Sequence, residues 1–199
     1  MKPVFLKYGN TNTYLVGPLL IDTDMAGTLP ALWRELKRQG AKPDLIRYVL
    51  ATHYHPDHMG LIGELTRRGA TLLLMEHQLP FVHASDAIFA RGKQTSFVPV
   101  DERQAVLLSC GESRAFLAGI GIEGEIVPTK SHSPDGAALV LDDGCAFVGD
   151  LEPREYLGGY DGNEALRGDW DALLRLGARV IHYGHANVQV LTESGRNGA

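Results

Sequence analysis

Three imidazoles and one carboxylate occur within six consecutive residues near the start of the chain. Residues 52–58 read Thr-His-Tyr-His-Pro-Asp-His, and the side chains that can donate to a metal are His53, His55, Asp57 and His58. Imidazole nitrogens and carboxylate oxygens are the ligands that proteins offer to zinc, iron and manganese. An ionised aspartate also supplies the negative charge that a neutral histidine lacks. Such a dense group predicts a metal site rather than a set of structural histidines.

The flanking residues place this cluster on a turn between a strand and a helix. Residues 46–51 are apolar and β-branched enough for a buried strand. After Gly60 the apolar residues return at helical spacing, and Gly69 closes the segment. The cluster therefore follows the carboxyl end of a strand, which is where open α/β sheets carry their sites.

One turn cannot complete the ligand shells of two metal ions, so further donors are expected where other strands end. Three polar side chains have such a context: His132 before a strand at 137–141, Asp150 at the end of a strand over 145–148, and His185 after a strand at 179–182. Gly149 permits a close backbone approach beside Asp150.

The remaining pattern predicts a layered α/β architecture. Further strands are predicted at 4–6, 14–16, 19–22, 71–75, 115–117 and 125–127, and helices between Thr28 and Gly40, between Gly60 and Gly69, and at 79–89 and 170–176. Two β-rich halves, each finishing with a helix and a strand, favour α/β layers around one core. We expect one domain over residues 1–191 and a polar C-terminal tail over 192–199.

Composition narrows the class of protein. Of the 199 residues, 44% are hydrophobic and 22% are charged, which suits a globular domain. The formal net charge of −5 does not favour nucleic acid as a partner. No apolar stretch approaches the ~20 residues that cross a membrane, so no membrane partner is expected. With only Cys110 and Cys145, we expect no disulfide framework and a cytoplasmic location.

The order of these motifs resembles the metallo-β-lactamase fold superfamily, in its small single-domain, glyoxalase II-like form. The resemblance rests on Leu20-Ile21-Asp22-Thr23, the run over residues 53–58, His132, Asp150 and His185. It implies a four-layer αββα sandwich with a dinuclear metal site at one edge of the two sheets. By the same resemblance, His53, His55 and His132 hold one metal, Asp57, His58 and His185 hold the second, and Asp150 bridges both. Asp22 matches an outer carboxylate that orients a histidine ligand.

This site implies a hydrolase that needs no serine or cysteine nucleophile. Two metals roughly 3.5–4 Å apart can share a hydroxide that attacks at neutral pH. We expect a small ester, thioester or lactone as substrate, Asp57 among the catalytic groups, and two divalent metal ions. Zinc is the expected metal, and iron and manganese are alternatives. A phosphodiesterase acting on nucleotides and a mononuclear iron sulfur dioxygenase are the alternative functions. A basic groove would favour the former, and bound iron with oxygen consumption the latter.

Differences between this sequence and individual subfamilies narrow the choice of subfamily. The commonest secreted β-lactamases resemble the chain loosely, because they have a cysteine where Asp150 stands, and flavodiiron proteins have a glutamate where His55 stands. Substrate contacts are expected in the loops at 77–98 and 152–168, with Arg154, Tyr156 and Tyr160 as candidates. A cation beside aromatic rings would suit an anionic, partly apolar small molecule. Solvated charges and packing aromatics explain the same residues equally well. The sequence leaves the substrate and the oligomeric state open.

Overall fold

Two mixed β-sheets organise the chain, one in residues Met1–Ser109 and one in residues Cys110–Ala199, which we call unit 1 and unit 2. The computed structural model describes residues 2–92, 96–159 and 163–191. The prediction of one domain over residues 1–191 therefore stays a prediction, and the predicted tail at 192–199 lies outside the described residues. Within the described ranges, no helix combines the length and the apolar character needed to cross a membrane.

Unit 1 contains a six-stranded sheet in the order β1-β2-β3-β4-β5-β6. Its strands are β1 (Val4–Leu6), β2 (Thr13–Val16), β3 (Leu19–Ile21), β4 (Tyr48–Leu50), β5 (Thr71–Met75) and β6 (Val106–Leu108). The first three strands pair antiparallel, and β3 to β6 pair parallel. β2 and β3 are buried along their whole length and β4 and β5 at all but their first residue, which explains their near-continuous apolar sequences.

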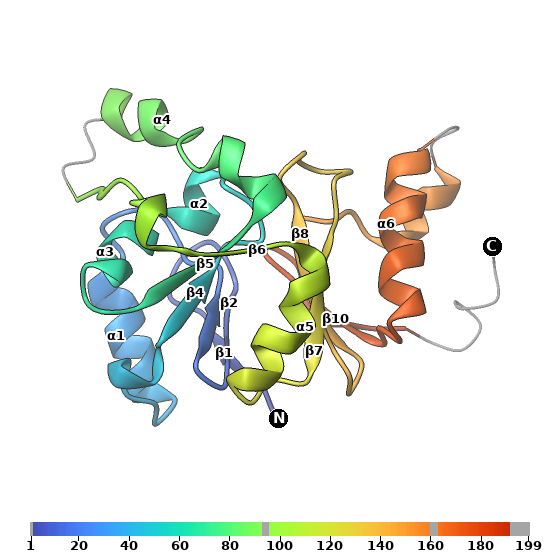
Figure 1. Ribbon diagram of the computed structural model, residues 1–199, viewed down its shortest axis with the longest axis horizontal. Helices are drawn as coiled ribbons and strands as arrows, with labels where there is room; N and C mark the ends of the chain where they lie inside the picture. Colours follow the sequence, from blue (N-terminus) through green and yellow to red (C-terminus); the bar gives the residue numbers. More distant parts are fainter. Residues whose placement is uncertain (1, 93–95, 160–162, 192–199) are drawn as a thin grey trace. The chain divides into compact units, whose positions relative to one another are not determined.

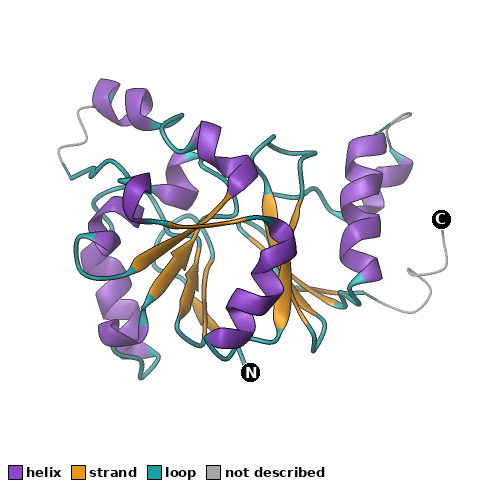
Figure 2. Ribbon diagram, viewed as in Figure 1, coloured by secondary structure: helices purple, strands orange, loops and turns teal. Residues whose placement is uncertain are grey.

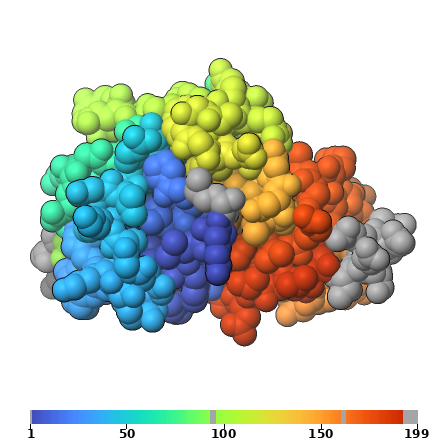
Figure 3. All heavy atoms as spheres, turned by 90° about the horizontal axis from the view of Figure 1, so that it is seen from below, coloured from blue at the N-terminus to red at the C-terminus, as the bar shows by residue number. Residues whose placement is uncertain are grey.

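The helices of unit 1 cover its sheet and supply one large apolar core. They are α1 (Leu29–Arg38), α2 (Pro56–Met59), α3 (Ile62–Thr66) and α4 (Asp86–Arg91), with 3₁₀ turns η1 (Pro43–Leu45), η2 (Glu76–Phe81) and η3 (Glu102–Gln104). Leu29, Leu32 and Leu36 of helix α1 are buried in the same core cluster as Val49 of β4. Figure 3 shows the outer surface of these first elements, coloured blue and light blue.

Unit 2 contains a five-stranded sheet in the order β11-β10-β9-β8-β7. Its strands are β7 (Gly124–Pro128), β8 (Ala137–Leu141), β9 (Cys145–Gly149), β10 (Val180–Tyr183) and β11 (Gln189–Val190). Only β9 and β10 pair parallel; the other neighbours are antiparallel. Helices α5 (Cys110–Gly119) and α6 (Glu164–Arg175) and the 3₁₀ turn η4 (Arg154–Gly158) complete the unit (Figure 1). Trp170 and Leu173 of α6 pack on Val140 and Ile181 of the sheet.

The predicted α/β class is confirmed: each unit has a mixed sheet flanked by helices (Figure 2). The strand predicted at 115–117 is wrong, because these residues lie inside α5; an apolar run this short does not separate a strand from a buried helical turn. The single helix predicted at 79–89 is also wrong. It divides into η2 and α4, with Pro80 inside the first piece and Ser85 before the second. Helix α6 begins at Glu164, earlier than predicted, because the side chain of Asn163 caps it.

Candidate metal centre

The donors of unit 1 lie where β4 ends and α2 begins. His53 and His55 precede α2, whereas Asp57 and His58 lie inside it. The turn between them is held by side chains from later in the chain. The amide of Gln78 donates to the carbonyl of Ala51 at 3.0 Å, and the hydroxyl of Ser85 donates to the carbonyl of Tyr54 at 2.6 Å. Because Gln78 and Ser85 are buried, the backbone that carries the histidines is fixed by the core of unit 1.

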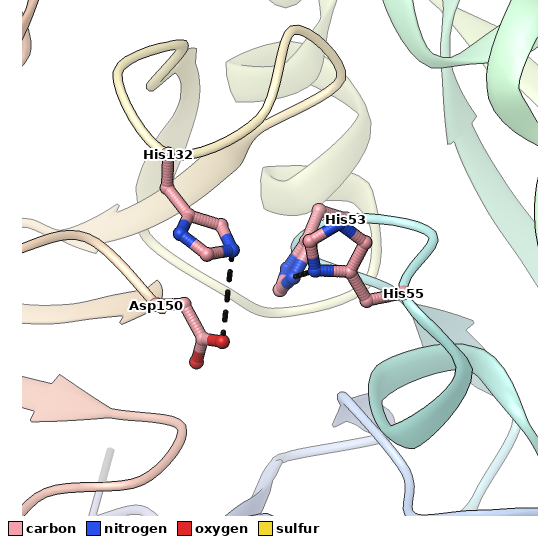
Figure 4. A group of neighbouring side chains, drawn as sticks. All are labelled: His53, His55, His132 and Asp150. Atoms are coloured by element: carbon pink, nitrogen blue, oxygen red, sulfur yellow. Dashed lines mark hydrogen bonds and ion pairs between the residues drawn. The ribbon is translucent and has the colours of Figure 1, made fainter.

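The histidine rings of unit 1 converge. Nε2 of His53 lies 2.9 Å from Nδ1 of His55, a pair that Figure 4 draws with a dashed line. The ring centroids of His53 and His58 are 4.1 Å apart. Two imidazole nitrogens that face each other at this distance either share a proton or flank a cation, because their lone pairs repel. This arrangement fits a metal-binding set of nitrogens.

Asp22 determines which nitrogens of His53 and His58 carry protons. Its carboxylate accepts from Nδ1 of His58 at 2.9 Å and from the hydroxyl of Thr52 at 2.8 Å. Since that hydroxyl has a single proton, its oxygen accepts from Nδ1 of His53, which is 3.2 Å away. Both rings therefore carry the proton on Nδ1 and have their lone pair on Nε2, the nitrogen that could bind a metal. Asp22 adopts a φ of 56°, a left-handed conformation that aspartate tolerates better than most residues.

Asp57 has a contact that sequence reasoning missed. Its Oδ2 accepts from the hydroxyl of Thr11 at 3.3 Å and lies 3.9 Å from Nε2 of His58. Thr11 is fully buried, and Asp24 accepts from the backbone amide of the preceding residue, Asn10, at 2.8 Å. Nothing in the sequence pattern links Thr11 to a residue 46 positions later, because the contact depends on how the loop between β1 and β2 folds.

The donors of unit 2 gather around one carboxylate. Nε2 of His132 lies 3.7 Å from Oδ2 of Asp150, the second pair drawn in Figure 4. Nε2 of His185 lies 3.5 Å from Oδ1 of the same side chain. Asp150 follows β9, where Gly149 has a φ of 58° and its carbonyl accepts from the amide of Gly184 at 2.7 Å. Asp150 therefore has one oxygen directed towards each histidine, as a bridging ligand requires.

In both units, the predicted ligand residues carry side chains that can bind a metal ion. Each of the seven offers one nitrogen or carboxylate oxygen of a group that could hold a metal ion. His53 and His58 are buried, whereas the side chains of His132, Asp150 and His185 are 33%, 19% and 35% exposed. A nitrogen-and-oxygen set of this kind fits zinc, iron and manganese. Asp22 lies beside His58, where an outer carboxylate was predicted.

The predicted substrate residues lie in and after η4. Arg154 and Tyr156 belong to this turn, and the side chain of Tyr156 is 49% exposed. Tyr160 lies outside the described residues. The turn is tied to β11, because the amide of Gln189 donates to the carboxylate of Glu155 at 3.2 Å. Substrate contact by Arg154, Tyr156 and Tyr160 stays a prediction.

Residues 6–185 match the sequence model of one family, described as the metallo-beta-lactamase superfamily. The chain belongs to this superfamily. The match runs from β1 to His185 and so includes every predicted ligand. The chain is thus a metallo-β-lactamase-fold protein with the ligand chemistry of a metal-dependent hydrolase.

Two curated proteins with similar sequences are longer than this chain. An atrochrysone carboxyl ACP thioesterase of Aspergillus terreus (strain NIH 2624 / FGSC A1156) is 29% identical over 189 residues, which are 89% of this chain and 50% of the fungal protein. Metallo-beta-lactamase domain-containing protein 1 of Rattus norvegicus is 39% identical over 64 residues, which are 32% of this chain and 25% of the rat protein. The chain therefore spans half or less of each relative.

Two solved structures are similar to this chain over nearly its whole length. The protein TTHA1623, crystallised in a di-iron-bound form, has a TM-score of 0.68 and 27% identity, covering 96% of this chain and 94% of that one. The metallo-beta-lactamase family protein TTHA1429 from Thermus thermophilus has a TM-score of 0.69 and 24% identity, covering 94% of this chain and 73% of that one. The second likeness shows the fold alone.

Proposed function

We propose that this protein is a dinuclear metal-dependent hydrolase of a small acyl compound, with a thioester as the leading substrate class. The observation that carries the proposal is the set of seven possible metal donors. All seven lie within the part of the chain that matches the superfamily. His53, His55 and His132 would hold one metal ion, Asp57, His58 and His185 the second, and Asp150 both. Two divalent ions bound there would acidify a water molecule and polarise the oxygen of the scissile group.

The protein's own residues prepare this site before any ion binds. Asp22 acts on His58 directly and on His53 through the hydroxyl of Thr52. It holds both rings in the tautomer whose Nε2 can bind a metal. Asp57 and Asp150 bring two negative charges, which offset part of the charge of two dications. Asp57 is also the residue that we place among the catalytic groups, because it is the only carboxylate in the run over residues 52–58.

The thioester substrate is supported by the similarity to the fungal ACP thioesterase, which extends over 89% of this chain. An ester or lactone remains within the same chemistry, because all three present a carbonyl carbon to the attacking water. We further propose a small-molecule substrate for a protein located in the cytoplasm, with neither nucleic acid nor a membrane as partner.

Zinc is the metal that we propose for the site, and iron is the alternative that a specific observation favours. TTHA1623, which is similar over 96% of this chain, was crystallised with two irons. The same nitrogen and oxygen donors accept either ion, so availability in the cell contributes to the choice. Elemental analysis of protein purified without added metal distinguishes them. Bound iron together with oxygen consumption would replace the hydrolase proposal with an iron oxygenase.

The test of the function is turnover of a matched substrate panel by metal-replete protein. The panel contains acyl thioesters, lactones and simple esters, with a bis-aryl phosphodiester as the comparison. We expect turnover of carboxyl substrates, fastest for thioesters, and its loss in the Asp57→Ala variant, which excludes contaminating hydrolases. Turnover of the phosphodiester alone would contradict the proposal and indicate a nucleotide phosphodiesterase.

A further inference from the structure

Helix α6 contacts two of the three described loops of unit 2 that contain a predicted ligand. One loop joins β7 to β8 and contains His132, and the other follows β9 and begins with Asp150. Two neighbouring residues of α6 make these contacts: Asp169 accepts two hydrogen bonds from backbone amides, and Trp170 donates one to a backbone carbonyl. Neither residue has a part in the chemistry proposed above.

Asp169 holds the loop of His132. Its Oδ1 accepts from the backbone amide of Lys130 at 3.1 Å, and its Oδ2 accepts from that of Ser131 at 2.7 Å. The side chain is only 8% exposed. A carboxylate that accepts from two consecutive amides fixes both the position and the direction of that backbone, and these charge-assisted bonds are among the stronger ones. His132 is the next residue, so its Cα position depends on this contact.

Trp170 holds the segment after Asp150. Its indole Nε1 donates to the carbonyl of Glu152 at 3.0 Å. The ring is fully buried in the core cluster that also contains Leu166 and Leu173 of α6 and Leu151, the residue after Asp150. Because the core fixes the indole, the bond transfers that rigidity to the backbone two residues beyond Asp150.

Bonds within each loop do not replace this common support. The amide of Thr129 donates to the carbonyl of Gly136 at 2.9 Å, and the amide of Leu151 donates to the carbonyl of Val148 at 3.2 Å. These bonds shape each loop separately. His132 lies between Pro128 and Ala137, outside the strand pairing that joins β7 to β8, so the sheet does not hold it directly. Asp169 and Trp170 are adjacent on helix α6 and therefore fix the position of one loop relative to the other.

We propose that Asp169 and Trp170 act as a clamp, a pair of positioning residues that holds His132 and Asp150 at the separation needed to bind a metal. The inference rests on the proposed function in that it assumes these two side chains to be metal ligands. In the structure, Nε2 of His132 and Oδ2 of Asp150 are 3.7 Å apart. Losing a partner bonded to the ligand itself weakens metal binding about 10–100-fold. Because Asp169 and Trp170 bond to the backbone beside each ligand, we expect an effect at the lower end of that range.

The test compares Asp169→Asn, Asp169→Ala and Trp170→Phe with the parent protein. Asn keeps one acceptor for the two amides and Ala keeps none, whereas Phe keeps the buried ring but loses the donor. The control is Asp171→Ala, which removes a carboxylate of the same helix that has no hydrogen bond to the described residues of either loop. Each variant is titrated with Zn²⁺ against a chromophoric chelator. Amide exchange at residues 130 and 131 is measured by NMR in the metal-free protein, and melting temperatures confirm folding.

We expect the Zn²⁺ dissociation constant to rise about ten-fold in Asp169→Asn and further in Asp169→Ala, with the control unchanged. The amides of Lys130 and Ser131 should exchange faster in the two Asp169 variants and not in Trp170→Phe. The double variant Asp169→Asn/Trp170→Phe should lose less affinity than the product of the single losses, because both residues hold one geometry. Single losses that simply multiply would overturn the joint clamp.

Failure of the clamp and failure of the function give different results. If the parent protein binds Zn²⁺ tightly and the Asp169 variants bind it equally well, the clamp is wrong and the proposed function stands. If the parent binds no divalent metal, the proposed function is wrong, and the exchange of the two amides still reports whether Asp169 holds the loop. Unchanged exchange in folded Asp169→Ala would overturn the clamp by itself.

Discussion

The two units position their predicted ligands by different physical means. In unit 1, buried side chains hold the ligands directly: Asp22 accepts from His58, and Thr11 donates to Asp57. In unit 2, backbone contacts do this: Asp169 accepts from the amides before His132, and Gly184 donates to the carbonyl before Asp150. His53 and His58 are buried, whereas His132 and His185 are about one-third exposed. We infer that the contacts in unit 1 fix which nitrogens of the histidine ligands carry protons. The contacts in unit 2 fix the position of the backbone beside the ligands.

The largest expected effect is at Asp150, the carboxylate that lies beside both predicted histidine ligands of unit 2, His132 and His185. In Asp150→Asn the side chain keeps its size but loses its charge, so neither His132 nor His185 has an anionic neighbour among the unit 2 donors. We expect metal affinity to fall by more than about 100-fold, since losing an outer partner alone costs 10–100-fold. Calorimetric titration with Zn²⁺ measures this. Affinity within ten-fold of the parent would mean that Asp150 does not bridge.

The next largest expected effect tests whether Asp22 fixes the proton on Nδ1 of His58. In Asp22→Asn the new amide can donate to Nδ1 of His58, which would move that ring's proton to the metal-binding Nε2. We expect a loss of metal affinity of about 10–100-fold, although Asn tolerates the left-handed backbone at this position. Thr52→Val should cost less, because it affects the path to His53 alone. Nitrogen chemical shifts of the imidazoles report the tautomers, and unchanged tautomers in Asp22→Asn would contradict the claim.

Thr11 gives a smaller and more specific effect. Thr11→Val removes the hydroxyl that donates to Asp57 at 3.3 Å but keeps the shape of the buried side chain. We expect a few-fold weaker binding of one of two metal ions and a loss of about 1 kcal/mol of stability. Thr11→Ser should restore the affinity. If Val and Ser variants bind metal alike, the contact with Asp57 has no role in positioning it.

The smallest expected effect is on the pH dependence of stability, and it comes from two histidines that are not predicted ligands, His83 and His182. Partial burial opposes protonation of His83, but hydrogen bonds to the carboxylates of Asp86 and Glu102 outweigh this and raise its pKa. In unit 2, burial lowers the pKa of His182, whose ring stacks on Phe147. His83 therefore stabilises the fold below its unfolded pKa of about 6.5, and this contribution is lost as pH rises through its higher folded pKa. His182 has the opposite sign: stability is lost as pH falls from about 6.5 through its lower folded pKa.

Melting curves of metal-free protein between pH 5 and 8 measure both contributions. His83→Gln should lower the melting temperature at the acid end only, by an amount corresponding to no more than about 1 kcal/mol because the side chain is half exposed. His182→Phe should flatten the parent's loss of stability at the acid end. Parallel profiles for the parent and both variants would show that neither histidine titrates as described.

The comparison also explains what the sequence could predict. The donors of unit 1 lie within one short run, so their spacing alone indicates a metal site. His132, Asp150 and His185 are far apart in the chain, and only their places at strand ends and the resemblance to a superfamily singled them out. The supporting residues were missed because Thr11, Asp169 and Trp170 act through contacts that no sequence pattern carries.

The fold was predictable where apolar runs were long and buried, as at β5, β8 and β9. Prediction failed where the run was short or only partly buried. Strand β6 was missed because its three residues are half-buried or exposed, as expected of an edge strand. The run at 115–117 has too few apolar residues to show whether its period is that of a strand or a helix.

Counting metal ions tests the central claim most directly. We would measure zinc, iron and manganese per chain in metal-replete parent protein and in Asp57→Ala, with circular dichroism to confirm that both are folded. The proposed assignment predicts two ions in the parent and one in the variant, together with loss of thioester hydrolysis. Two ions and full activity in folded Asp57→Ala, or fewer than two ions in the parent, would contradict the dinuclear site.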